Sequence, residues 1–252
     1  MRFANFTAAL LSVVFAFTLL SVGDARADWS LFGKSVSLSG KTKIETRAVS
    51  GFTGVSLGTV GSVEIEQGNS EGVTIEADEN ILPYILTTVD RGTLQIRWDK
   101  VARTDGNLRI KIIVRAININ SLAVGGSGTI RAPRLQTTNL NASVGGSGNI
   151  SIEALAAKKL STAIGGSGTF TASGAAETFN ISIGGSGMVR SKALMAEKVS
   201  VSVAGSGSTV VSARDALSVS IAGSGSVDYY GDPKLSVSTA GSGRVRRLGA
   251  QL

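Results

Sequence analysis

Apolar and polar residues alternate in short runs along this chain, and from Ile119 onward the runs repeat around Gly-Ser-Gly triplets. Two places before each triplet stands one column: Val124, Val144, Ile164, Ile183, Val203, Ile221 and Thr239. Two places after each triplet stands another: Ile130, Ile150, Phe170, Val189, Thr209, Val227 and Val245. Between the apolar positions lie small polar residues: Asn141, Ser143, Ser161, Asn180, Ser182, Ser200, Ser202, Ser218, Ser220, Ser236 and Ser238. This period of two predicts strands that turn an apolar face to the core and a Ser/Asn face outward.

The triplets recur with a nearly constant period. They begin at Gly126, Gly146, Gly166, Gly185, Gly205, Gly223 and Gly241, in steps of 20, 20, 19, 20, 18 and 18 residues. A repeat of this length is typical of coils that stack on one another. We therefore predict an all-β fold, a right-handed parallel β-helix (β-solenoid) with about 18–20 residues per coil, whose handedness follows the rule for parallel crossovers.

The triplet glycines are predicted to form the corners of the coils. A corner requires glycine either because its φ is positive or because a neighbouring coil leaves no room for a Cβ. The residue before the triplet changes from glycine to alanine at Ala204, Ala222 and Ala240, so that position tolerates a Cβ. The predicted structural glycines are Gly126, Gly128, Gly146, Gly148, Gly166, Gly168, Gly185, Gly187, Gly205, Gly207, Gly223, Gly225, Gly241 and Gly243.

The chain before the repeat is also strand-like. Val63–Glu66 and Val73–Glu76 alternate apolar and polar residues, while Pro83 interrupts the pattern. Only 154–160 and 192–198 have a pattern that would suit a helical turn. We predict a β-solenoid part at 44–118 and the triplet-repeat part at 119–252, together one continuous domain (44–252), after a lead-in segment at 28–43.

The first 27 residues have the pattern of a secretory signal peptide. Arg2 is followed by an apolar run over 6–22 and by Ala25-Arg26-Ala27, an A-x-A cleavage site. The alternative is an uncleaved membrane anchor, for which the apolar run is short. We therefore predict an exported protein of the periplasm or cell surface, with no transmembrane segment after cleavage.

The composition limits which kinds of catalytic, metal-binding and nucleic-acid-binding site the chain can form. The chain contains no cysteine and no histidine, so it has no disulfide and lacks the commonest general base and metal ligand. Its formal charge of +7 favours loose attraction to anionic surfaces. Because the basic residues are scattered, the sequence gives no indication of nucleic-acid binding.

The glycine-rich corners do not have the residues of a metal or phosphate site. The stretch 165–169 opens like a calcium-binding nonapeptide, but Phe170 stands where the liganding aspartate belongs. No G-x-x-x-x-G-K-[ST] loop is present. We predict no metal and no cofactor.

A β-helix polysaccharide lyase or hydrolase would need charged residues gathered at one level of the solenoid. The acidic candidates adjoin turn residues or arginine: Asp78, Glu79, Asp90, Asp215, Asp228 and Asp232. We therefore predict no catalytic residue. Three or more acidic and basic residues at one level would favour the enzyme.

Two features near the C-terminus are candidates for contact with other molecules. In the stretch 229–233, Tyr229, Tyr230 and Asp232 combine aromatic rings, a turn and an acid, which suits either a ligand contact or a structural turn. Arg244, Arg246 and Arg247 are expected to discourage end-to-end stacking. An uncapped terminal coil would instead favour assembly.

The span from Phe52 to about Val245 resembles the head GIN domain of putative autotransporter adhesins. The resemblance rests on 63–68, on 73–82, on 92–96, on the serial triplets and on 230–233. It implies an exported bacterial β-helix protein with an adhesive role, and it supplies no catalytic residues.

These observations predict a non-enzymatic β-solenoid that acts by surface interaction in the bacterial envelope, as an adhesin or by contact with glycans. The expected partners are envelope or host glycans or proteins, not nucleic acid, and the protein could form a homo-oligomer. The alternatives are a polysaccharide-degrading enzyme of the β-helix type and a structural or self-assembling envelope protein.

Overall fold

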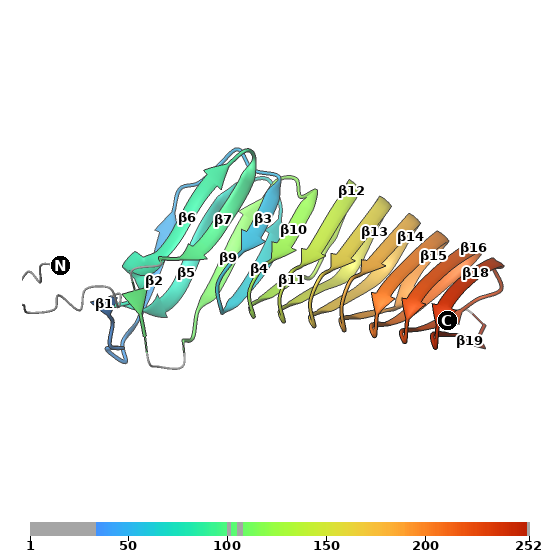
Figure 1. Ribbon diagram of the computed structural model, residues 1–252. Helices are drawn as coiled ribbons and strands as arrows, with labels where there is room; N and C mark the ends of the chain where they lie inside the picture. Colours follow the sequence, from blue (N-terminus) through green and yellow to red (C-terminus); the bar gives the residue numbers. More distant parts are fainter. Residues whose placement is uncertain (1–33, 100–101, 105–107, 251–252) are drawn as a thin grey trace, which may run out of the picture. The chain divides into compact units, whose positions relative to one another are not determined.

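The computed structural model describes residues 34–99, 102–104 and 108–250 (Figure 1). The predicted signal peptide and the first part of the lead-in segment lie outside these residues. No helix among the described residues is long and apolar enough to cross a membrane.

The triplet-repeat part is a stack of parallel strands, in which each coil pairs with the one before it (Figure 1). Its strands are β10 (Ser121–Val124), β11 (Thr129–Ala132), β12 (Leu135–Val144), β13 (Asn149–Ile164), β14 (Thr169–Ile183), β15 (Met188–Gly205), β16 (Ser208–Gly223), β17 (Ser226–Tyr230), β18 (Lys234–Gly241) and β19 (Arg244–Gly249). The predicted β-solenoid is confirmed. The segments 154–160 and 192–198 lie within β13 and β15 and form no helical turn.

The register places like residues over like residues, as the repeat predicts. Val144 pairs with Ile164, Ile164 with Ile183, and the same column continues through Val203 and Ile221. Each of these five side chains is 1% exposed. Because full burial of a Val or Ile side chain contributes about 1.5–3 kcal/mol, such columns are the main source of stability in a chain without disulfides.

The N-terminal part combines parallel and antiparallel strands. Its strands are β1 (Lys34–Ser35), β2 (Thr42–Arg47), β3 (Gly54–Leu57), β4 (Ser62–Gln67), β5 (Gly72–Asp78), β6 (Ile85–Asp90), β7 (Thr93–Trp98), β8 (Ala102–Arg103) and β9 (Lys111–Ala116), with a 3-10 turn at Leu82–Tyr84. β3 and β4 pair in parallel with β10 and β11, which extends the solenoid. β2–β5, β5–β9 and β6–β7 pair antiparallel.

The order of strands in space differs from their order in the chain at this end. β3 lies between β7 and β10, and β4 lies between β9 and β11. The chain therefore leaves the first solenoid level, builds β5 to β9 outside it, and returns to β10 through the short link 117–120. Ile81, Leu82 and Ile85 are at most 2% exposed, so the core is covered at this end.

The opposite end of the stack is open in the described part of the chain. β18 pairs only with β16, β19 pairs only with β17, and every residue of β18 is exposed. Leu235 and Val237 continue two core columns but are 45% and 46% exposed. Two of the three arginines of β19 form ion pairs: Arg246 with Asp228 at 3.0 Å and Arg247 with Asp232 at 3.4 Å.

Close packing between coils explains most of the corner glycines. A Cβ on Gly146 would lie 2.6 Å from the carbonyl oxygen of Gly126, and a Cβ on Gly128 would lie 2.7 Å from that of Thr59. Among the triplet glycines, φ is positive only at Gly205, Gly223 and Gly241, where alanine precedes the triplet. Proximity to the preceding coil is thus the general reason for glycine at these corners, and a positive φ is an additional reason only at Gly205, Gly223 and Gly241.

Candidate functional site

One surface of the solenoid carries two parallel columns of small residues, which we call the serine face. The first column is Ser121, Asn141, Ser161, Asn180, Ser200, Ser218 and Ser236. The second column is Ala123, Ser143, Ala163, Ser182, Ser202, Ser220 and Ser238. The strand ladder itself sets this register, because consecutive coils pair residue for residue.

The serine face is shallow and continuous along the stack. Its side chains alternate with buried ones such as Leu160, Thr162 and Ile164, so within the two columns each strand presents only Ser, Asn or Ala outward. A groove of about 490 Å³ runs over this surface from Ser121 to Ser220. Neighbouring coils of the solenoid lie about 4.8 Å apart, so an extended ligand in the groove would meet polar groups at about that interval.

The polar groups of the serine face are free to bind a ligand. Across the described residues, none of its hydroxyl or amide side chains makes a hydrogen bond to another protein group. Serine hydroxyls and asparagine amides each supply both donors and acceptors. The two columns contain no charged residue, so a ligand on this face would be held by hydrogen bonds and van der Waals contact rather than by charge.

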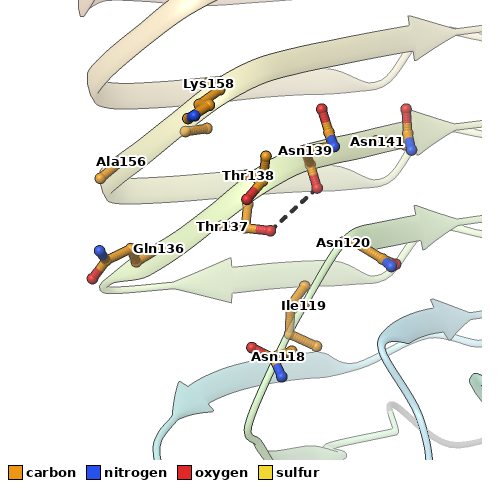
Figure 2. A pocket seen from close by; sticks show the side chains of 11 residues that line it. Asn118, Ile119, Asn120, Gln136, Thr137, Thr138, Asn139, Asn141, Ala156 and Lys158 are labelled. Carbon is orange, nitrogen blue, oxygen red and sulfur yellow. Dashed lines mark hydrogen bonds between the residues drawn. The ribbon is translucent and has the colours of Figure 1, made fainter.

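A second depression adjoins the start of the serine face (Figure 2). This amide hollow has a volume of about 730 Å³ and is lined by Asn118, Ile119, Asn120, Gln136, Thr137, Thr138, Asn139, Asn141, Ala156, Ala157 and Lys158. Figure 2 shows these side chains on the link 117–120, on β12 and on the next coil. Lys158 is the one charged group in the lining, and Asn141 lines both the hollow and the groove.

The amide hollow exists because one coil is incomplete. The link 117–120 crosses directly to β10, so the first part of β12 has no strand beside it on that side. The side chain of Gln67 takes the place of that strand. Its Nε2 donates to the carbonyl oxygens of Gln136 and Ile117 at 2.9 and 3.2 Å, and its Oε1 accepts from the backbone N–H of Gln136 at 2.8 Å.

One group of three charged residues comes near the condition under which an enzyme would be favoured, but it spans two neighbouring coils, with Glu197 on β15 and the other two residues on β16. Arg214 contacts Glu197 at 2.8 Å and Asp215 at 3.0 Å. The hydrogen bond and charge of Asp215, followed by those of Glu197, raise the pKa of Arg214. Because one guanidinium holds both carboxylates and all three side chains are exposed, the arrangement is typical of a surface ion-pair network.

The other acidic candidates lie apart from the serine face and the hollow. Asp78 accepts hydrogen bonds from Ser39 and from the backbone N–H of Gly40 and Asn80, which ties the lead-in segment to β5. Asp90 lies 3.5 Å from Arg91. Within the described ranges, no three acidic side chains gather where they could hold a metal ion.

The three residues predicted as a ligand contact are not presented together. Tyr229 points into the core, stacked on Val211, and is 8% exposed. Tyr230 is half-buried, whereas Asp232 is exposed and paired with Arg247. The ring of Tyr229 is thus part of the packing, which leaves Tyr230 and Asp232 at the surface.

Sequence reasoning found the serine face but missed the amide hollow. The face follows from the repeat, whereas the hollow combines Gln67, the link 117–120 and the start of β12, which are far apart in the chain. A run of asparagines at 118, 120, 139 and 141, on either side of the first triplet, was the available signal.

Comparisons with solved structures agree with this architecture. A putative adhesin from Bacteroides fragilis is 26% identical, with a TM-score of 0.80 over 84% of this chain and 100% of that chain. A putative lipid binding protein from Parabacteroides distasonis is 23% identical (TM-score 0.71, 85% and 100% covered). A putative adhesin from Parabacteroides merdae is also 23% identical (TM-score 0.67, 85% and 99% covered).

The family comparison extends over most of the chain. A search of curated proteins gives no match. Residues 51–233, which run from the turn before β3 to the turn after β17, match the family described as "putative auto-transporter adhesin, head GIN domain". The chain belongs to this family.

Proposed function

We propose that this protein is an exported, non-enzymatic β-solenoid that acts in the bacterial envelope by holding a glycan chain along the serine face. The observation that carries the proposal is the pair of in-register columns of unpaired hydroxyl and amide groups. Membership of a family of putative adhesins supports a surface role. The Bacteroides fragilis neighbour is likewise named a putative adhesin.

The chemistry of the face suits sugars. Hydroxyl and amide groups pair with sugar hydroxyls, and each such hydrogen bond contributes about 0.5–1.5 kcal/mol net. Single contacts of this size are weak, but an extended chain that meets several coils sums them. An extended chain is therefore a better ligand for this face than a single sugar.

Binding of the purified protein to a glycan array, with product release followed in the same wells, tests the proposal. Retention without cleavage is the expected result. Ser182→Tyr and Ser202→Tyr place bulky rings in the groove and should abolish retention. The matched control is Asn149→Tyr, an exposed outward position of β13 on another side of the coil.

Two outcomes would contradict the proposal. Release of shortened glycans would support the polysaccharide-degrading alternative and direct attention to Glu197, Arg214 and Asp215. Retention that survives both tyrosine variants would place the binding surface elsewhere.

Export is a separate part of the proposal with its own measurement. The signal peptide predicted over residues 1–27 requires a mature chain that begins at Asp28. Mass spectrometry of the protein isolated from the envelope fraction of the producing bacterium should find that N-terminus. An intact Met1 would instead support the membrane-anchor alternative.

The open end favours a second candidate function, self-assembly. β18 leaves one backbone edge unpaired among the described residues and exposes Leu235 and Val237. Edge strands of this kind pair readily with another copy. Light scattering after size exclusion should then show a concentration-dependent dimer that Val237→Lys disrupts, while Asn149→Lys does not. A monomer at all concentrations would exclude this candidate.

A further inference from the structure

A third column of residues borders the serine face, next to its first column. From one coil to the next the strand ladder pairs Asn139, Lys159, Thr178, Lys198, Ala216 and Lys234. Lysine thus occupies every second coil, and a neutral residue occupies each coil between. The triplet corners border the face on its other side and carry no charge.

The alternation sets the spacing between successive lysines along the solenoid. Since neighbouring coils lie about 4.8 Å apart, successive lysines in the column start about 9.6 Å apart along the solenoid. A pyranose in an extended chain advances about as far as one coil. Two coils therefore correspond to about one disaccharide, so the lysines lie in step with every second sugar.

The three lysines are available to a ligand. Each is exposed, and none forms an ion pair with an acidic side chain of the described chain. The carboxylates next to this column in the sequence belong to Glu177, Glu197 and Asp215, and Arg214 already contacts the last two. The three lysines and Arg214 outnumber these three carboxylates, so the formal charge of the groups along this border is +1, the sign that an anionic ligand requires.

We propose that the ligand is a linear acidic polysaccharide with a carboxylate on every second sugar, lying along the solenoid with its carboxylates on Lys159, Lys198 and Lys234. This inference deepens the proposed function and rests on it, because the serine face supplies the hydrogen bonds to the sugar hydroxyls. The lysine column adds selection for charge and for the spacing of that charge.

Solution binding of two hexasaccharide probes tests the inference. A hyaluronan hexasaccharide carries one carboxylate per disaccharide, and cellohexaose is a neutral extended chain of equal length. The hyaluronan probe should bind at least tenfold more tightly at low salt, and added salt should reduce the difference. Each of Lys159→Gln, Lys198→Gln and Lys234→Gln should weaken its binding by up to about fivefold, as expected for exposed ion pairs.

A charge-neutral exchange separates spacing from net charge. The double variant Thr178→Lys with Lys198→Gln keeps the number of lysines in the column but moves one out of phase. It should bind hyaluronan as weakly as Lys198→Gln alone. Lys192→Gln removes an exposed lysine outside the column and should leave binding unchanged.

The possible results distinguish failure of the spacing inference from failure of the proposed function. If the exchange variant binds like the wild type, or if Lys192→Gln weakens binding equally, the spacing inference is wrong. If both probes bind equally and only the groove variants Ser182→Tyr and Ser202→Tyr reduce binding, the lysine column has no role but the proposed function holds. If neither probe binds, the inference is wrong, and the glycan array alone decides the proposed function. If only anionic vesicles bind, both are wrong.

Discussion

At the scale of single residues, the Gly-Ser-Gly corner gives two adjacent glycines very different surroundings. A Cβ on Gly165 meets nothing within 4 Å, whereas a Cβ on Gly166 would overlap the carbonyl oxygen of Gly146 in the preceding coil. We expect Gly166→Ala to lower the free energy of unfolding by at least about 2 kcal/mol, because backbone cannot move aside as a side chain can. Gly165→Ala should be neutral or slightly stabilising.

Denaturant unfolding of both variants measures the difference. Both variants add one methyl group at neighbouring positions of the same corner, so each serves as the other's control. Equal shifts of the midpoint would contradict the packing argument.

Buried hydroxyls give a second prediction at this scale. Thr162 and Thr209 occupy core columns and are 3% and 1% exposed, and their Oγ1 atoms have no hydrogen-bond partner. Thr162→Val and Thr209→Val replace an unsatisfied hydroxyl with a methyl group of the same shape. Each should raise the free energy of unfolding by about 1 kcal/mol in thermal or denaturant melts. A loss of stability would mean that these hydroxyls are satisfied in solution.

At the scale of elements, the side chain of Gln67 substitutes for a missing strand beside β12. Gln67→Ala removes its hydrogen bonds to Gln136 and Ile117 and leaves backbone groups unpaired, which should cost about 1–3 kcal/mol. Gln136 takes part through its backbone alone, so Gln136→Ala is the matched control and should change stability little. Amide hydrogen exchange at residue 136 should become faster only in the Gln67 variant. Equal exchange rates in both would show that the bridge does not hold this edge.

The elements also show what the sequence could and could not predict. In the repeat, the alternation of apolar and small polar residues around each triplet predicts where the strands lie, how consecutive coils pair and which side chains are exposed. The serine face was therefore predictable from columns such as Ser200, Ser218 and Ser236. Before Ile119 each strand alternates in the same way whether its partner is parallel or antiparallel. The hairpin of β6 and β7 depends on a tight turn at Arg91 and Gly92, with φ of 46° and 73°. Neither that turn nor the return of the chain past β3 produces a repeating pattern of residues, so the sequence did not predict them.

At the scale of the whole solenoid described here, the two ends differ in how they cover the core. Antiparallel strands and the turn Leu82–Tyr84 cover one end, whereas β18 and β19 leave the other exposed. Stability should therefore be distributed unevenly along the stack. In a repeat fold each coil is stabilised mainly by its immediate neighbours, so a terminal coil with one neighbour is the weakest.

A matched pair of substitutions in one core column tests this gradient. Val201 and Val237 belong to the same column, but Val201 is 3% exposed with a coil on each side, and Val237 is 46% exposed with a coil on one side only. Val201→Ala should cost about 2 kcal/mol in the free energy of unfolding, and Val237→Ala less than about 1 kcal/mol. If another copy covers the open end in solution, the cost at Val237 should rise with protein concentration and approach that at Val201. Denaturant melts of both variants at several concentrations therefore separate an end that is exposed from one that is an interface.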